Sequence, residues 1–189
     1  MDITINRLPV LITFIFWVVF VMYWVINIYR INKKSVTTES RGFLSLAGTA
    51  IVVYLPIHWG FLGYKVLQEN TATGIIGIVV CAGGLLFAVW SREILGKSWS
   101  AAVTLQKDHK LIQRGPYGFV RHPMYAGLLL GLLGSSITTG VLWGFLVTSI
   151  LILGIIGKLN GEEKLLTKQF PKEYPEYTKR AKALIPFIY

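Results

Sequence analysis

Between Pro123 and Gly157 the chain runs for 35 residues without one charged side chain. As a single α-helix this block would be about 52 Å long, well beyond the roughly 30 Å of a bilayer's hydrocarbon core. Residues that favour turns lie near its middle, at Gly134-Ser135-Ser136 and at Thr138-Thr139-Gly140. We therefore predict a helical hairpin in the membrane, with a short first arm.

Three earlier blocks are also free of Asp, Glu, Lys and Arg: Leu8–Tyr29 and Phe43–Tyr64 have 22 residues each, and Gly74–Ser91 has 18. Each is close to the roughly 20 apolar residues that a membrane-spanning helix requires. Charged residues make up 15% of the chain, below the roughly 25% of soluble domains. The sequence thus predicts an all-α, polytopic membrane protein with five transmembrane helices, the fourth and fifth forming the hairpin.

The chain has no linker rich in Pro, Gly or Ser and no internal repeat, so we expect a single membrane domain over 1–189. Residues 1–91 would hold the first three spans. Residues 92–189 would hold a polar loop, the hairpin and the tail. The third span contains four glycines, which are expected to let helices pack closely or to make room for a ligand; they are Gly74, Gly77, Gly83 and Gly84. Cys81, in the same span, is expected to serve packing.

The tail begins with a helical pattern of apolar residues that continues from the last span to Pro171, which we expect to end or bend the helix. Beyond it, we expect anchors at the membrane interface at Tyr174, Tyr177 and the terminal Pro186-Phe187-Ile188-Tyr189.

Basic residues are distributed very unevenly between the two predicted membrane faces. Seventeen of the 19 Lys and Arg residues fall in the 30–41 connection, the 92–121 segment and the tail from Lys158, leaving only Arg7 and Lys65 opposite. The positive-inside rule then predicts an outside N-terminus and a cytoplasmic C-terminus. Membrane lipids are the expected neighbours of this charge. Nucleic acid is not, because the basic residues flank spans and form no single stripe.

Polar chemistry is concentrated where the fourth predicted helix begins, at Arg121-His122-Pro123-Met124-Tyr125. Antiparallel neighbours joined by a short turn bring their far ends together. Glu162 and Glu163, at the end of the fifth helix, should therefore meet this segment. A structural interpretation is also open: Arg121 and His122 would be interfacial anchors, Glu162–Lys164 a solvated helix face, and any pairing of Arg121 with Glu163 purely structural. Phosphate-loop and dinucleotide-binding glycine motifs are absent, and the three histidines lack the spacing of zinc ligands.

Three features of the sequence carry a family resemblance. The segment Gly115–Tyr125, the Glu162-Glu163 pair and the spacing Phe170-x-x-x-Tyr174-x-x-Tyr177 together resemble the isoprenylcysteine carboxyl methyltransferase family. The resemblance covers roughly Gly96 to Pro186, about half of the chain. It implies an integral membrane enzyme that uses S-adenosylmethionine, with the cofactor pocket closed by the preceding loop and by a C-terminal helix.

The resemblance also assigns roles. Arg121 and Glu162 become the candidate catalytic residues. Arg121 is expected to orient other groups of the site or to form an ion pair, and not to react itself. Lys158 falls where the family has a substrate-orienting arginine, and a lysine offers a point charge instead of a two-pronged clamp. The residues implied to contact the cofactor are His109, Lys110, Leu111, Ile112, Tyr117, His122, Pro123, Met124, Tyr125 and Glu162.

The predicted function is methyl transfer from S-adenosylmethionine to a hydrophobic or lipid-borne acceptor that enters from the bilayer. Such a displacement requires alignment of donor and acceptor and no metal. The carboxylate of a prenylated cysteine, another lipid amine or carboxylate, and a small thiol all remain open as acceptors. An NADPH-dependent reductase is an alternative, since the ending Pro186-Phe187-Ile188-Tyr189 is similar to that of sterol double-bond reductases. A non-enzymatic membrane protein is another.

Overall fold

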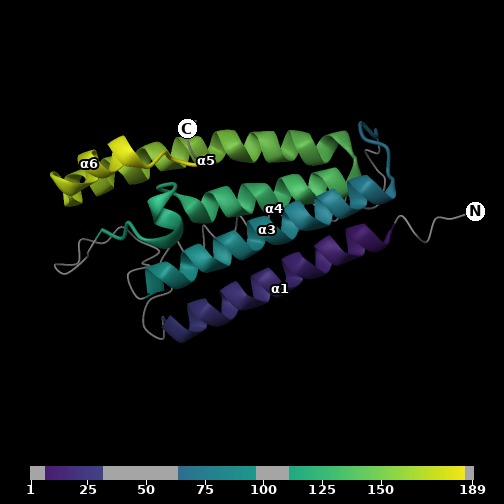
Figure 1. Cartoon of the computed structure of the whole chain (residues 1–189), viewed down its shortest axis with the longest axis horizontal. Helices are drawn as coiled ribbons and strands as arrows, with labels where there is room; N and C mark the ends of the chain where they lie inside the picture. Colours follow the sequence, from purple (N-terminus) through teal and green to yellow (C-terminus); the bar gives the residue numbers. More distant parts are fainter. Residues whose placement is uncertain (1–6, 32–63, 97–110, 186–189) are drawn as a thin grey trace, which may run out of the picture.

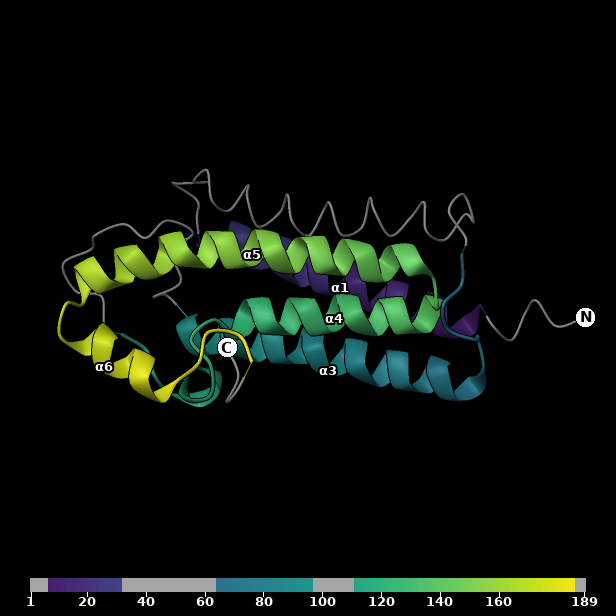
Figure 2. The same ribbon diagram turned by 90° about the horizontal axis from the view of Figure 1, so that it is seen from above.

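The computed structural model describes residues 7–31, 64–96 and 111–185. Four long helices lie side by side in it, and a short helix doubles back at one end (Figures 1 and 2). In chain order the elements are α1 (Leu8–Ile31), α3 (Thr71–Leu95), the 3-10 helix η2 (Gly115–Gly118), α4 (Pro123–Thr139), α5 (Leu142–Gln169) and α6 (Glu173–Arg180).

Three of these helices, α1, α3 and α5, are long and apolar enough to cross a membrane. The predicted all-helical, multi-pass membrane fold is therefore confirmed. The second predicted span, 43–64, lies almost entirely outside the described residues, so the count of five spans stays a prediction, as does the division at residue 91. α4 has 17 residues and is about 25 Å long, whereas the 28 residues of α5 reach about 42 Å. α5 therefore extends well past the start of α4.

The hairpin turn between α4 and α5 forms at Gly140, one of the two predicted places. Gly140 has a φ of +64°, which glycine adopts without strain, and its N–H donates to the Ser136 carbonyl. Its own carbonyl accepts from the N–H of Val66 at 2.8 Å. At the other candidate turn the helix continues, because the Ser135 and Ser136 hydroxyls donate back to carbonyls one turn earlier.

Small residues bring α3 and α4 into close contact, as predicted for the third span. A Cβ placed on Gly84 would lie 2.5 Å from the Gly131 nitrogen, and one on Gly127 would lie 2.5 Å from the Gly84 oxygen. Cys81 is fully buried in this interface, which agrees with its predicted packing role. Gly83 faces open space instead and takes no part. The aromatic rings of α1 cover this pair of helices, with Trp17, Phe20 and Trp24 in one buried cluster.

The end of α5 and the tail form a separate small core. α5 ends at Gln169, just before Pro171, as expected. Tyr174 and Tyr177 are only 1% and 4% exposed, and they pack with Ala181 against α5. The prediction that these tyrosines are interfacial anchors is therefore wrong. Their i, i+3 spacing places both rings on one face of α6, and that face turns inward because α6 folds back along the chain (Figure 2).

Candidate functional site

The polar site lies where α4 begins beside the charged end of α5. Since α4 is short and antiparallel to α5, its first turn lies beside the charged residues that follow Gly157 (Figure 1). There the Tyr125 hydroxyl donates to Glu162 Oε1 at 2.8 Å. Lys158, one helical turn before Glu162, places its Nζ 3.7 Å from the same oxygen and 5.4 Å from the centre of the Tyr125 ring. A carboxylate, a phenol and an ammonium thus converge at the junction of two helices.

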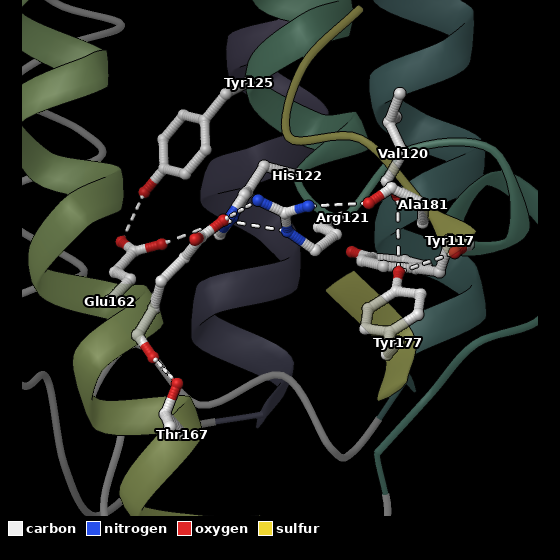
Figure 3. A network of polar contacts seen from close by, with 10 residues as sticks. Tyr117, Val120, Arg121, His122, Tyr125, Glu162, Thr167, Tyr177 and Ala181 are labelled. Carbon is white, nitrogen blue, oxygen red and sulfur yellow. Dashed lines mark hydrogen bonds and ion pairs between the residues drawn. The ribbon is translucent and has the colours of Figure 1, made fainter. Parts of the chain in front are cut away.

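Arg121 connects α5 to the C-terminal tail. Its Nε and Nη2 both donate to Glu163 Oε1, at 2.9 and 2.6 Å, while Nη1 donates to the Ala181 carbonyl at 2.6 Å (Figure 3). The Arg121 side chain is 12% exposed and that of Glu163 is 26% exposed. This ion pair is therefore partly desolvated and strengthened by hydrogen bonds, unlike a pair at the surface. The predicted pairing of Arg121 with Glu163 is confirmed, whereas the catalytic role assigned to Arg121 stays a prediction.

His122 lies between the two carboxylates. Its Nε2 lies 3.2 Å from Glu163 Oε1, and its Nδ1 lies 3.7 Å from Glu162 Oε2. The ring is 7% exposed, and the residue is the N-cap of α4 with Pro123 at the first helical position. An ionised carboxylate only accepts, so in the closer contact Nε2 carries the hydrogen and donates it to Glu163. His122 therefore lies between the two acidic side chains and is hydrogen-bonded to Glu163.

The turn before α4 is held from behind by the tail. The Tyr177 hydroxyl donates to the Tyr117 carbonyl at 2.5 Å (Figure 3). Burial raises the pKa of the Tyr177 phenol, so that it remains a protonated donor throughout the physiological range. Burial, with the nearby Tyr177, also raises the pKa of Tyr117, whose own ring is 8% exposed.

The predicted site residues are not all in one place. Five of them meet in the network just described: Arg121, His122, Tyr125, Lys158 and Glu162. Pro123 is fully buried at the start of α4.

The other predicted residues lie elsewhere. Met124 packs on the aromatic cluster of α1, and Leu111 packs in the tail core with Tyr174. Ile112 is half-buried just before η2, and Tyr117 contributes its carbonyl to the tail contact. His109 and Lys110 lie outside the described residues. The cofactor contacts assigned to these residues stay predictions.

Sequence reasoning missed how the tail reaches the site. Residues 181–183 run parallel to the segment before α4, and the N–H groups of Arg121 and His122 donate to the carbonyls of Lys182 and Ala183 at 2.7 and 2.9 Å. This pairing uses only main-chain atoms, so no side-chain pattern signals it. Within the described residues, no group of three or more His, Cys, Asp and Glu side chains could hold a metal ion.

Residues 72–173 match the family model described as PEMT, phospholipid methyltransferase. The chain belongs to the phospholipid methyltransferase family. The match includes all of the network except the tail, so the family and the geometry single out the same part of the molecule. The resemblance to isoprenylcysteine carboxyl methyltransferases is confirmed by the individual relatives.

Two curated relatives illustrate the range of the family. Protein-S-isoprenylcysteine O-methyltransferase of Saccharomyces cerevisiae is 29% identical over 179 residues, which cover 86% of this chain and 71% of that protein. Cobalt-zinc-cadmium resistance protein CzcN of Cupriavidus metallidurans is 34% identical over 101 residues, covering 51% of this chain and 45% of the relative. The chain thus spans less than half of one of these relatives and under three quarters of the other.

A solved structure supports the fold. The eukaryotic intramembrane Ras methyltransferase ICMT (isoprenylcysteine carboxyl methyltransferase) superposes with a TM-score of 0.61 at 23% identity. The superposition covers 85% of this chain and 60% of that one. At this level of identity the likeness establishes the arrangement of helices.

Proposed function

We propose that the protein transfers a methyl group from S-adenosylmethionine to a lipophilic acceptor within the membrane, with the carboxylate of a prenylated cysteine as the first acceptor to test. The observation that carries the proposal is the convergence of Glu162, Tyr125, His122 and Lys158 at the junction of α4 and α5. Membership of a methyltransferase family and the yeast relative's name support the same reaction.

The residues present fit the amino-acid end of the cofactor. Glu162 is 26% exposed, and its Oε2 lies 3.7 Å from His122, beyond hydrogen-bond distance, so among the described residues this oxygen keeps acceptor capacity for an ammonium group. Helix geometry leaves the N–H of Met124, in the first turn of α4, without an intrahelical partner, and such a group suits a carboxylate. We assign Glu162 to the ammonium and the start of α4 to the carboxylate.

When bound, the cofactor supplies an electrophilic methyl group on its sulfonium. The chain's own residues align the reactants and set the local charge. Arg121 and Glu163 neutralise each other, so that the carboxylate of Glu162 remains for the ligand. Tyr125 offers an aromatic face, and such faces attract cations by about 0.5–2 kcal/mol. The family resemblance also assigns His109, Lys110, Leu111, Ile112 and Tyr117 to the cofactor. Of these, Leu111 packs in the tail core and Tyr117 binds Tyr177 through its carbonyl.

Lys158 is the proposed contact for the acceptor. Its side chain is 37% exposed at the point where the uncharged part of α5 ends. An acceptor arriving sideways from the bilayer would meet one positive charge there, and an acceptor carboxylate already ionised needs no strong general base. In line with the charge asymmetry of the sequence, we place this end of the bundle and the C-terminus on the cytoplasmic side, where the soluble cofactor is available.

The test is transfer of radiolabelled methyl from S-adenosylmethionine to a prenylated cysteine derivative and, in parallel, to an amine phospholipid, using purified protein in lipid. We expect label on the cysteine carboxylate and loss of transfer in Glu162→Gln. Glu176→Gln is the matched control, since Glu176 lies exposed on α6 and pairs with Lys179. Label on the phospholipid alone would reassign the acceptor. No label on either acceptor, together with no binding of S-adenosylmethionine, would refute the proposal.

A further inference from the structure

The C-terminal strap, which we define as residues 181–185, lies directly against the segment that carries Arg121 and His122. Val120 and Lys182 form a parallel bridge, and the strap accepts hydrogen bonds from the N–H groups of Arg121 and His122 at 2.7 and 2.9 Å. The Ala181 carbonyl also accepts from Arg121 Nη1 at 2.6 Å. Both site residues are therefore held by the tail through their main chain.

Tyr177 contacts both sides of this arrangement. Its hydroxyl donates to the Tyr117 carbonyl at 2.5 Å, in the turn that leads directly into Val120. Its own carbonyl accepts from the N–H of Ala181 at 3.0 Å, where the strap begins. The ring is 4% exposed and packs edge-on against Tyr174 at a centroid distance of 6.1 Å. Because the ring is enclosed, the hydroxyl has little freedom to leave the carbonyl.

We infer that Tyr177 is a positioning residue for the site, acting through the strap and the turn before α4. Its hydroxyl contacts main-chain oxygens, the carbonyls of Tyr117 and Val120. By joining the turn to the strap, it fixes the main chain of Arg121 and His122, and these two residues in turn hold Glu163 and face Glu162. The consequence for cofactor binding rests on the proposed function, whereas the consequence for docking of the strap does not.

The decisive variant is Tyr177→Phe, which keeps the packed ring and removes the hydroxyl. We expect the dissociation constant and the KM for S-adenosylmethionine to rise roughly three- to tenfold with little change in kcat, as expected for one lost buried hydrogen bond. Trypsin cleavage after the exposed Lys182 should become faster by a similar factor, because cleavage requires the strap to leave the turn.

Thr178→Val is the matched control. Its hydroxyl also comes from α6, but it donates to the Pro175 carbonyl at 2.8 Å within the same helix and joins no second element. We expect wild-type affinity and cleavage from it. Arg180→Gln is a second test that preserves the core, since exposed Arg180 donates to Gln113 at 3.0 Å and joins α6 to the segment before η2. For Arg180→Gln we expect weaker binding of S-adenosylmethionine and faster trypsin cleavage, both by a smaller factor than for Tyr177→Phe.

The outcomes separate the two claims. If the wild-type protein binds no S-adenosylmethionine, the proposed function is refuted. Trypsin cleavage then still tests whether Tyr177 holds the strap against the turn. Tyr177→Phe that matches Thr178→Val in both readouts overturns the inference. A lower unfolding temperature with unchanged affinity and cleavage also overturns it, since that result means packing alone. If Tyr177→Phe fails to fold, the test relies on Arg180→Gln. Weaker binding of S-adenosylmethionine together with faster trypsin cleavage supports the inference, and no change in either measurement overturns it.

Discussion

The two halves of α4 are held by opposite kinds of contact. From Gly127 onward the helix packs on α3 through glycines, where a single added carbon would meet main-chain atoms. At its beginning it is held by the Arg121–Glu163 ion pair, by the hydrogen bond of Tyr125 to Glu162 and by main-chain hydrogen bonds that Arg121 and His122 donate to the tail. The first region is stabilised by close fit in an apolar surrounding, and the second by matched charges. In the first region the position of α4 therefore depends on the volume of the side chains at the contact. In the second region it depends on which polar partner is present.

The sharpest challenge to the packed region is Gly127→Ala. The new Cβ would lie 2.5 Å from the Gly84 oxygen and 2.7 Å from the Ala88 nitrogen, neither of which can move without shifting a helix. We expect a loss of about 3 kcal/mol in the free energy of unfolding, at the upper end for overpacked interiors. Gly83→Ala is the control, because nothing lies within 4 Å of its added carbon. Equal unfolding temperatures of the two variants in detergent would contradict the close approach of α3 and α4.

Arg121→Met addresses the polar region. It leaves Glu163 without its main partner while keeping much of the apolar stem. We expect a loss of about 2 kcal/mol in unfolding free energy, less than for a fully buried pair because Glu163 is 26% exposed. Lys65→Met is the control, since the Lys65–Glu69 pair has a similar 2.9 Å separation but Lys65 is 53% exposed. If chemical denaturation shows the same small loss for both, the Arg121 pair is only a surface contact.

These two regions also differ in how far the sequence could predict them. The uncharged blocks of the sequence predicted the membrane helices, and the glycines of the third block predicted the close packing of α3. Both features depend on local composition, which the sequence shows directly. The turn at Gly140 was predictable from its residue type. The alternative turn at Ser135 and Ser136 was not formed, and there the hydroxyls donate to carbonyls within the helix. The short turn between two antiparallel helices then indicated that the segment with Tyr125 would lie near Glu162.

The tail was beyond prediction from composition. Tyr174 and Tyr177 have the residue type of membrane anchors, and only the return of α6 along the chain turns them inward. Main-chain pairing of Lys182 with Val120 leaves no trace in the side chains. Of the adjacent acids Glu162 and Glu163, the sequence interpretation named Glu163 as a partner of Arg121, and the structure agrees. The two acids differ by a rotation of roughly 100° about the axis of α5, so only one of them faces Arg121 directly.

The smallest expected effect lies in the packed region, at a polar contact inside it. Trp17 Nε1 donates to Ser135 Oγ at 2.9 Å, joining α1 to α4. A double-mutant cycle of Trp17→Phe and Ser135→Ala should give a coupling energy of about 0.6 kcal/mol, the average for hydrogen bonds between membrane helices. A coupling above about 2 kcal/mol would show that this half also depends strongly on polar partners, against the contrast drawn above.

The most direct test of the central claim compares two ligands on one variant. S-adenosylmethionine carries an ammonium group, whereas methylthioadenosine lacks the amino-acid end. If Glu162 holds the ammonium, Glu162→Gln should weaken binding of S-adenosylmethionine by roughly 10- to 100-fold, the range for a charged hydrogen bond, and leave methylthioadenosine binding unchanged in calorimetry. Equal weakening of both ligands, or unchanged binding of both, would contradict the assignment of this junction of α4 and α5 to the cofactor.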